Sequence, residues 1–279
     1  MGPRLCCGGE WLDLAQPLVM GVLNVTPDSF SDGGRHADAG AAVARGLELV
    51  AEGAAIIDGG GESTPPGAAP VSVDEELRRV IPVIRGLAGQ ARALLSVDTS
   101  QPEVMRQAVD AGARLINDVR ALRLPGALEA AAVSGAGVCL MHMQGDPGTM
   151  QRRPEYVDVV NEVKAMLAAR VQACIAAGIA PERLCLDPGI GFGKLLSHNL
   201  ELLRRLPELG TEGRPLLIGV SRKSLLRELT GRAVGERLAG SVALAAIAVL
   251  RGAHIVRAHD VAATYDALRV AVALRAASG

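Results

Sequence analysis

The sequence places residues that could bind, orient and ionise a small molecule directly after short apolar runs. In chain order these are Asn24, Asp58, Asp98, Asn117, His142 and Asp187, then Ser221, Arg222 and Lys223, and finally Arg257 and His259. Carboxylates accept hydrogen bonds, amides both donate and accept, and Arg, Lys and His donate. Because an Arg fork also matches phosphate oxygens, the set suits a flat heterocycle that carries a phosphate-type group.

A plainer structural explanation exists for several of these residues. Asp58, Asp98 and Asp187 precede Gly, Thr-Ser and Pro-Gly respectively, and Asp is common at the start of such turns. His142 lies between two Met residues, which favours a packing histidine over a ligand. No HExxH, paired Cys/His or GxSxG motif occurs, so zinc and serine-hydrolase chemistry are not indicated.

The apolar runs are continuous rather than alternating, which is typical of parallel strands buried on both faces. They predict strands over residues 17–24, 54–59, 93–98, 114–119, 137–143, 184–189, 215–221 and 254–260. Ala- and Leu-rich segments with a spacing near 3.6 predict helices over residues 40–53, 74–88, 101–112, 125–135, 156–178, 199–210, 237–252 and 261–277. Eight βα units in about 250 residues indicate an α/β fold of the TIM (β/α)8 barrel type, whose active sites form at the C-terminal ends of the strands.

We expect a single domain, with an N-terminal extension over residues 1–16 and the barrel over residues 17–279. No linker-like or low-complexity stretch interrupts the series of units. A doubly wound sheet is the alternative fold, but the Gly-rich nucleotide loop that usually follows its first strand is absent from the sequence.

Composition argues against several classes of partner. Lys and Arg total 29 against 30 for Asp and Glu, and aromatic residues make up 2%, so we expect no nucleic acid. No apolar run reaches the ~18 residues of a membrane span, so we expect no membrane. The five cysteines lack metal-ligand spacing and are expected to be small buried hydrophobes in the cytoplasm.

Seven stretches resemble, in order and spacing, the motifs of the dihydropteroate synthase family. They are MGVLNVTPDSFSDGG, IIDGGGESTPPGA, SVDTSQPEV, INDV, LDPGIGFGK, GVSRKS and VRAHD, and the match covers about residues 18–275. The resemblance implies a TIM barrel, usually a homodimer, that acts as a transferase in folate biosynthesis and is a sulfonamide target. It would join 6-hydroxymethyl-7,8-dihydropterin pyrophosphate to p-aminobenzoate and release pyrophosphate, assisted by Mg²⁺.

Site roles in that family carry over to the residues of this sequence that match the motifs. The resemblance implies that the pterin is bound by Asp58, Asp98, Asn117, Met141, Asp187, Phe192, Gly219 and Lys223. It implies that Asn24 coordinates Mg²⁺, that Thr64, Arg257 and His259 bind pyrophosphate, and that Phe30, Pro66 and Ser224 surround p-aminobenzoate. Asp98, Lys223 and Asn24 are the predicted catalytic residues, and the loop after Asn24 would close as a lid.

At two positions the sequence departs from the family pattern. Gly59 stands where the family usually has an aliphatic residue, which reduces packing in the second strand. Pro65 stands where the family usually has Arg, which removes a cation from the pyrophosphate loop and fixes a backbone angle.

Two other functions therefore stay open. A non-catalytic pterin-binding paralogue could keep the pterin residues and lose the reaction, and Pro65 favours it. A related methyltetrahydrofolate methyltransferase would be expected to lack the long lid and the SRKS loop, and both are present.

Overall fold

The structure is a computed structural model that describes residues 2–25, 35–61, 71–145, 150, 154–210 and 213–277, with the backbone alone for residues 35–38. Eight of its strands form one parallel sheet: β3 (Leu18–Asn24), β4 (Ile56–Gly60), β5 (Leu94–Asp98), β6 (Leu115–Asp118), β7 (Gly137–Met141), β8 (Leu184–Asp187), β9 (Leu217–Gly219) and β10 (Ile255–Ala258).

The sheet curls into a barrel. Its strand order is β8-β7-β6-β5-β4-β3-β10-β9, and a parallel bridge between Leu186 and Leu216 brings the two edge strands together. At that seam the Leu186 N–H donates to the Pro215 carbonyl at 2.9 Å. The predicted TIM barrel is confirmed, and all eight predicted strands are present.

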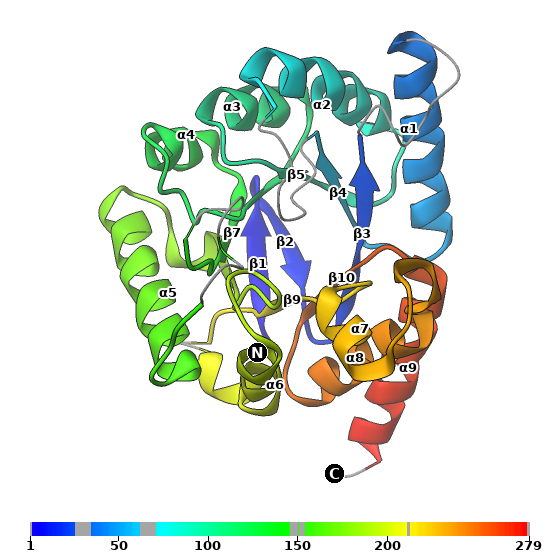
Figure 1. Cartoon of the computed structure of the whole chain (residues 1–279). Coiled ribbons are helices and arrows are strands. Elements are labelled where there is room, and N and C mark those ends of the chain that lie inside the picture. Colours follow the sequence, from blue (N-terminus) through cyan, green and yellow to red (C-terminus); the bar gives the residue numbers. More distant parts are fainter. Residues whose placement is uncertain are drawn as a thin grey trace.

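Helices surround the strands (Figure 1). They are α1 (Arg35–Ala51), α2 (Val73–Leu87), α3 (Pro102–Ala111), α4 (Ala127–Ser134), α5 (Val159–Ala176), α6 (Leu196–Arg204), α8 (Leu238–Leu250) and α9 (Val261–Ala276). In α2, the Ser72 hydroxyl caps the helix by accepting the Glu75 N–H at 3.3 Å, and Val80, Ile84 and Leu87 form a buried stripe at helical spacing. The helices bury such stripes against the outside of the barrel.

A short α-helix and an N-terminal hairpin were not predicted from the sequence. The short helix α7 (Ser224–Thr230) precedes α8, and a hairpin of β1 (Arg4–Cys7) and β2 (Glu10–Asp13) occupies much of the N-terminal extension. The hairpin strands are four residues long, too short to show periodicity. Their turn is formed by Gly8 and Gly9 at φ 60° and 85°, the conformation that two-residue hairpin turns favour.

The hairpin covers the N-terminal end of the barrel, where it crosses the ring of strands (Figure 1). Leu5 and Cys7 of β1 are buried together with residues from the first halves of the barrel strands; this base cluster comprises Leu5, Cys7, Leu14, Met20, Ile56, Leu115, Cys139, Cys185, Leu217 and Ile255. A larger apolar core lies between the strands and the helices. One end of the barrel is therefore apolar, and the polar strand ends gather at the other.

All five cysteines are free thiols. Cys7, Cys139, Cys174 and Cys185 are buried and Cys6 is partly buried, as expected from the apolar runs in which most of them occur. Among the described residues, no helix combines the length and apolarity that a membrane crossing requires.

Candidate active site

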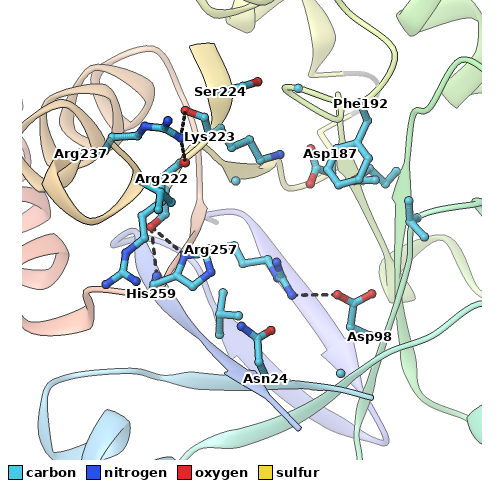
Figure 2. Close-up of a pocket in the computed structure, with 18 of the residues that line it drawn as sticks. Asn24, Asp98, Asp187, Phe192, Arg222, Lys223, Ser224, Arg237, Arg257 and His259 are labelled. Atoms are coloured by element: carbon cyan, nitrogen blue, oxygen red, sulfur yellow. Dashed lines mark hydrogen bonds and ion pairs between the residues drawn. The ribbon is translucent and has the colours of Figure 1, made fainter. Parts of the chain in front are cut away.

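A pocket of about 830 Å³ opens at the C-terminal ends of the strands (Figure 2). Its wall includes most of the predicted site residues, namely Asn24, Asp98, Asn117, Met141, Asp187, Phe192, Gly219, Lys223, Ser224, Arg257 and His259. Phe30, Thr64 and Pro66, together with Pro65 and most of the predicted lid, lie outside the described residues. The barrel therefore brings together side chains that are more than 230 positions apart in the sequence.

Asp58 lies behind this wall at the centre of a buried polar network. Its carboxylate is fully buried and accepts from Ser96 Oγ at 2.6 Å, from Asn117 Nδ2 at 3.0 Å and from Arg257 Nε at 2.6 Å. The Arg257 Nη2 group donates to Asp98 Oδ2 at 2.8 Å. Asp58 thus fixes Asn117 and Arg257, two side chains that face the pocket.

Ser96 was not predicted, because it lies inside a strand and not at its end. It lies two residues before Asp98 on β5, and alternate residues of a strand point to the same side. A polar residue at that spacing inside an apolar strand was the available signal.

Ionisation in this network is set by burial and by the shared cation. Burial lowers the pKa of Arg257, but Asp58 and Asp98 more than offset this effect, so its pKa is raised and it stays protonated. Burial raises the pKa of Asp98 well above its ordinary value, while Arg257 lowers it. Loss of the Arg257 charge would therefore leave two neighbouring carboxylates without their common partner.

Lys223 and Asp187 lie at the opposite side of the pocket, beside Phe192 (Figure 2). The Lys223 Nζ atom donates to the Ile190 carbonyl and lies 4.4 Å from the centre of the Phe192 ring. Burial lowers the pKa of Lys223 to about 8, against Asp187, which raises it. Burial raises the pKa of Asp187, while Lys223 is the main group that lowers it.

The loop that carries Lys223 and Ser224 is held in an unusual backbone conformation. Arg222 has a φ of 59°, and its guanidinium pairs with Asp260 through contacts of 2.5 and 3.0 Å. The Arg222 N–H donates to Ser241 Oγ at 3.0 Å. Arg237, which also lines the pocket, donates to the Arg222 carbonyl at 2.8 Å. Neither Ser241 nor Arg237 was predicted, because both come from the start of the helical region that follows.

His259 faces the pocket as a neutral side chain. The Nδ1 atom of its ring lies 3.0 Å from Ser221 Oγ, and its backbone N–H donates to the same oxygen at 3.2 Å. Burial, together with the nearby charges of Arg257 and Arg222, lowers the pKa of His259 to about 4. At neutral pH this residue therefore offers an anion a hydrogen bond and no full charge.

His142 does not line the pocket. It is 5% exposed, and Lys194 Nζ lies 2.9 Å from its Nδ1 atom, so the interpretation as a packing histidine suits it better than that of a substrate ligand. Lys194 is itself buried, and the sequence offered no direct sign of that, because Lys normally lies at the surface.

The described protein side chains do not form a complete metal site, so a metal ion here would need substrate oxygens among its ligands. They contain no group of three or more His, Cys, Asp and Glu side chains arranged for a metal. Asn24 ends β3 with an exposed side chain on the pocket wall, near Arg257 (Figure 2). A single amide oxygen could serve an ion whose other ligands are phosphate oxygens and water.

The chain is similar to known proteins along most of its length. The model of the family of pterin binding enzymes matches residues 20–259. Dihydropteroate synthase of Escherichia coli strain K12 is 55% identical over 267 residues, which is 96% of this chain and 95% of that protein.

Solved structures are similarly close. The structure of Xanthomonas albilineans dihydropteroate synthase with 4-aminobenzoic acid is 56% identical, with a TM-score of 0.93 over 99% of both chains. The enzyme of the same organism in complex with 7,8-dihydropteroate is 53% identical, with a TM-score of 0.89 over 98% of this chain and 99% of that one.

Proposed function

The chain belongs to the pterin-binding enzyme family, among its dihydropteroate synthases, and we propose that the pocket at the mouth of its barrel is where the reaction takes place. The protein is a transferase of folate biosynthesis that binds small-molecule substrates. It condenses 6-hydroxymethyl-7,8-dihydropterin pyrophosphate with p-aminobenzoate to give 7,8-dihydropteroate and pyrophosphate. The observation that supports the location is the single pocket wall that carries carboxylate, amide, lysine and arginine side chains from different strands.

The pterin ring binds between the two sides of this wall. Asp187 accepts hydrogen bonds from the amino and N–H groups of the ring edge, and Lys223 donates to the ring carbonyl, because these groups are complementary. Asn117 and Asp98 complete the polar edge, and Asp58 acts through Asn117 from behind the wall. Met141, Gly219 and Phe192 supply the flat apolar surfaces that a ring system requires.

Arg257 and His259 bind the pyrophosphate of the substrate. Two of the five N–H donors of Arg257 are used by Asp58 and Asp98, which leaves three for phosphate oxygens. His259 adds a neutral donor. Thr64, which lies outside the described residues, is proposed for the same side.

Mg²⁺ is proposed as the cofactor, with Asn24 as its protein ligand. The exposed amide of Asn24 fits one coordination position of such an ion, and the pyrophosphate oxygens and water would fill the others. When bound there, the ion neutralises charge that develops on the leaving pyrophosphate.

The reaction exchanges one bond for another at the pterin methylene carbon. Its bond to the pyrophosphate oxygen breaks, and the electron pair leaves with pyrophosphate. The arylamine nitrogen then forms a bond to the same carbon and loses a proton to solvent or to the leaving group. Arg257 accelerates the first step, because it binds the pyrophosphate more strongly as charge accumulates on the breaking oxygen.

p-Aminobenzoate is proposed to bind at the outer part of the pocket. Ser224 lies on the pocket wall at the first residue of α7, beside Lys223. Phe30 and Pro66 are proposed to complete this half of the site, and both lie outside the described residues.

The assembly is proposed to be a homodimer formed through α8 and α9, which pack side by side (Figure 1). Both helices expose large apolar side chains, among them Ile247 and Leu250 on α8 and Val270 on α9. Such a concentration is typical of an interface between copies of one chain. Sedimentation equilibrium tests it: the parent chain is expected at twice its monomer mass and the double substitution Ile247→Glu, Val270→Glu at the monomer mass.

The cytoplasm is proposed as its location. Buried free thiols suit a reducing compartment, because an oxidising one favours disulfides.

A coupled assay of pyrophosphate release tests the proposed site. Release is expected to require pterin pyrophosphate, p-aminobenzoate and Mg²⁺ together, and to collapse in Asp98→Asn. Tight pterin binding without release from the parent chain would instead identify a paralogue that kept the pocket and lost the reaction. Such an outcome would direct attention to Pro65, and the reverse substitution Pro65→Arg would be the next variant to assay.

A further inference from the structure

The turn that follows β8 folds directly against the chain that follows β7. It runs from Asp187 to Lys194, and its glycines at 189, 191 and 193 have φ values of 67°, 83° and 63°. A Cβ atom at Gly189 would collide with the His142 carbonyl oxygen, and one at Gly193 would lie 2.6 Å from the Gln144 carbonyl oxygen. The glycines therefore allow an approach that other residues would prevent.

Lys194 occupies the inside of this turn with an exposed fraction of 3%. Its Nζ atom lies 3.0 Å from the Gly189 carbonyl, 3.0 Å from the Phe192 carbonyl and 2.9 Å from His142 Nδ1. The His142 carbonyl is a more distant acceptor at 3.4 Å. An ammonium has three hydrogens, so the three nearer acceptors match its capacity, as a buried charge requires.

His142 accepts from this ammonium and must therefore be neutral. Burial lowers the pKa of Lys194 to about 7, against Asp187, which raises it, and below that pH its ammonium can only donate. In that state the Nδ1 atom of His142 carries the lone pair and its Nε2 atom carries the proton. Burial and the nearby Lys194 charge together lower the pKa of His142 to about 3, which agrees with a neutral ring.

The outside of the turn has supports of its own. The Tyr156 hydroxyl donates to the Gly193 carbonyl at 2.9 Å, and Asn199 Oδ1 accepts the Gly191 N–H at 2.7 Å. These contacts should keep the turn folded when the inner support is removed, although not in the same position.

On the pocket side, this turn supplies the groups that contact Lys223. Its Ile190 carbonyl accepts from Lys223 Nζ, and its Phe192 ring lies under the same ammonium (Figure 2). The turn also begins with Asp187, whose Oδ1 atom accepts the Gly189 N–H at 2.7 Å. Lys194 does not line the pocket, so its influence on a ligand passes through these groups.

We propose that Lys194, paired with neutral His142, is a positioning residue for the pterin half of the site. Its ammonium links Gly189 and Phe192 of the turn to the residue that follows β7. The turn held in this way keeps Lys223 and Asp187 in the positions from which they bind the edge of the pterin ring. This inference rests on the proposed function and adds to it a pair of side chains that touch no substrate.

The test compares Lys194→Met with two variants of its partner. His142→Asn keeps an acceptor near the position of Nδ1, whereas His142→Leu removes it. Calorimetric Kd values for pterin pyrophosphate without p-aminobenzoate, and KM values for both substrates, are measured for each protein.

We expect Lys194→Met to weaken pterin binding by about tenfold or more while the KM for p-aminobenzoate changes less than about twofold, since small displacements of binding groups are costly. His142→Leu should also weaken pterin binding. His142→Asn should bind pterin pyrophosphate with an affinity close to that of the parent chain.

Arg183→Met is the matched control for general loss of stability. Arg183 donates to the carbonyls of Ala131, Ala132 and Ala136 at 2.8, 3.3 and 2.8 Å, near the N-terminal end of the barrel. The substitution Arg183→Met removes a comparable set of charge-assisted hydrogen bonds, and the affinity for pterin pyrophosphate should be unchanged.

Equal pterin affinity in Lys194→Met and the parent, or equal loss for both substrates, would overturn the proposal. If Lys194→Met does not fold, the comparison of His142→Leu with His142→Asn decides the question by itself. Failure of the parent chain to bind pterin pyrophosphate would count against the proposed function, which is a different outcome.

Discussion

The charged side chains of the pocket are paired before any substrate arrives. Arg257 joins Asp58 to Asp98, and Lys223 lies against a carbonyl and an aromatic ring. Desolvation strengthens these contacts, and it also favours the neutral forms of Lys223 and Asp98. Substrate binding should therefore depend on pH. The lysine is the most direct case, since the pKa of Lys223 is lowered to about 8.

Pterin binding should weaken as pH rises through about 8. The ammonium form of Lys223 donates to the ring carbonyl, and its population falls up to about tenfold per pH unit above the pKa. The KM for pterin pyrophosphate between pH 6 and 10 measures this effect. Lys223→Arg should remove the inflection near pH 8, because Arg stays charged throughout. A parent profile that is flat to pH 9.5, or the same rise in Lys223→Arg, would contradict the assigned role.

Burial of neutral His142 should destabilise the fold in acid. Above pH 6.5 the ring is neutral in both folded and unfolded chains, so its stabilising contribution is complete. Below that pH the unfolded chain gains a proton that the folded chain excludes until about pH 3, and the free energy of unfolding falls by about 1.4 kcal/mol per pH unit.

Urea unfolding of the parent and His142→Asn between pH 4 and 8 measures this contribution. The two free energies should differ by a constant amount above pH 6.5, and the parent should lose stability faster below it. Parallel curves over the whole range would show that His142 takes up its proton equally in both states.

Residue type and position at a strand end were enough to predict many of the pocket side chains. Asn24, Asp98, Asp187 and Arg257 follow apolar runs in the sequence and line the pocket in the structure. The pairing of Lys194 with His142 was not predictable in this way, because it depends on how the turn after β8 lies against the end of β7. Two chain segments 52 residues apart meet there, and neither segment alone specifies the contact.

At the scale of elements, β4 contains a packing defect that the sequence had indicated. Gly59 lies beside a void of about 10 Å³ whose wall also includes Leu23, Ile57 and Val80. A Cβ atom at Gly59 would have only the Ser96 carbonyl within 4 Å, at 3.8 Å. The expected loss of packing from this glycine is therefore visible between β4 and α2, and the void can accept a methyl group.

Gly59→Ala should raise the free energy of unfolding by about 0.5–1 kcal/mol. It fills space and restricts the unfolded chain, with no left-handed backbone conformation to oppose it. Gly21→Ala on neighbouring β3 is the matched control, because its Cβ would lie 3.2 Å from Val261 and 3.3 Å from Ala54 and should destabilise. Urea unfolding measures both, and loss of stability in Gly59→Ala would show that β4 cannot accommodate the methyl group.

Long apolar runs specified the barrel strands well, because a parallel strand buried on both faces needs no alternation. The hairpin was not specified, since Leu5 and Cys7 point inward from a strand of only four residues and Trp11 on its partner is 56% exposed. Its fold is determined by the base of the barrel that it covers.

Across the whole molecule, stability and chemistry are assigned to opposite ends of the barrel. The N-terminal end is closed by the hairpin and the base cluster, and the C-terminal end carries the polar pocket. In TIM barrels, residues at the C-terminal end generally serve catalysis and residues at the N-terminal end serve stability. A change at the base should therefore alter stability without altering substrate binding.

Leu5→Ala tests this separation. Leu5 is fully buried among the first residues of the barrel strands, and its truncation should lower the free energy of unfolding by about 2–4 kcal/mol, the usual cost of such a cavity. Trp11→Ala on the same hairpin is the control and should stay within about 0.5 kcal/mol of the parent, because most of its side chain contacts water. Well below the unfolding temperature, the KM values of Leu5→Ala for both substrates should match those of the parent. A raised KM in folded Leu5→Ala would mean that the base cluster sets the positions of the strand ends, and that the two ends of the barrel are mechanically coupled.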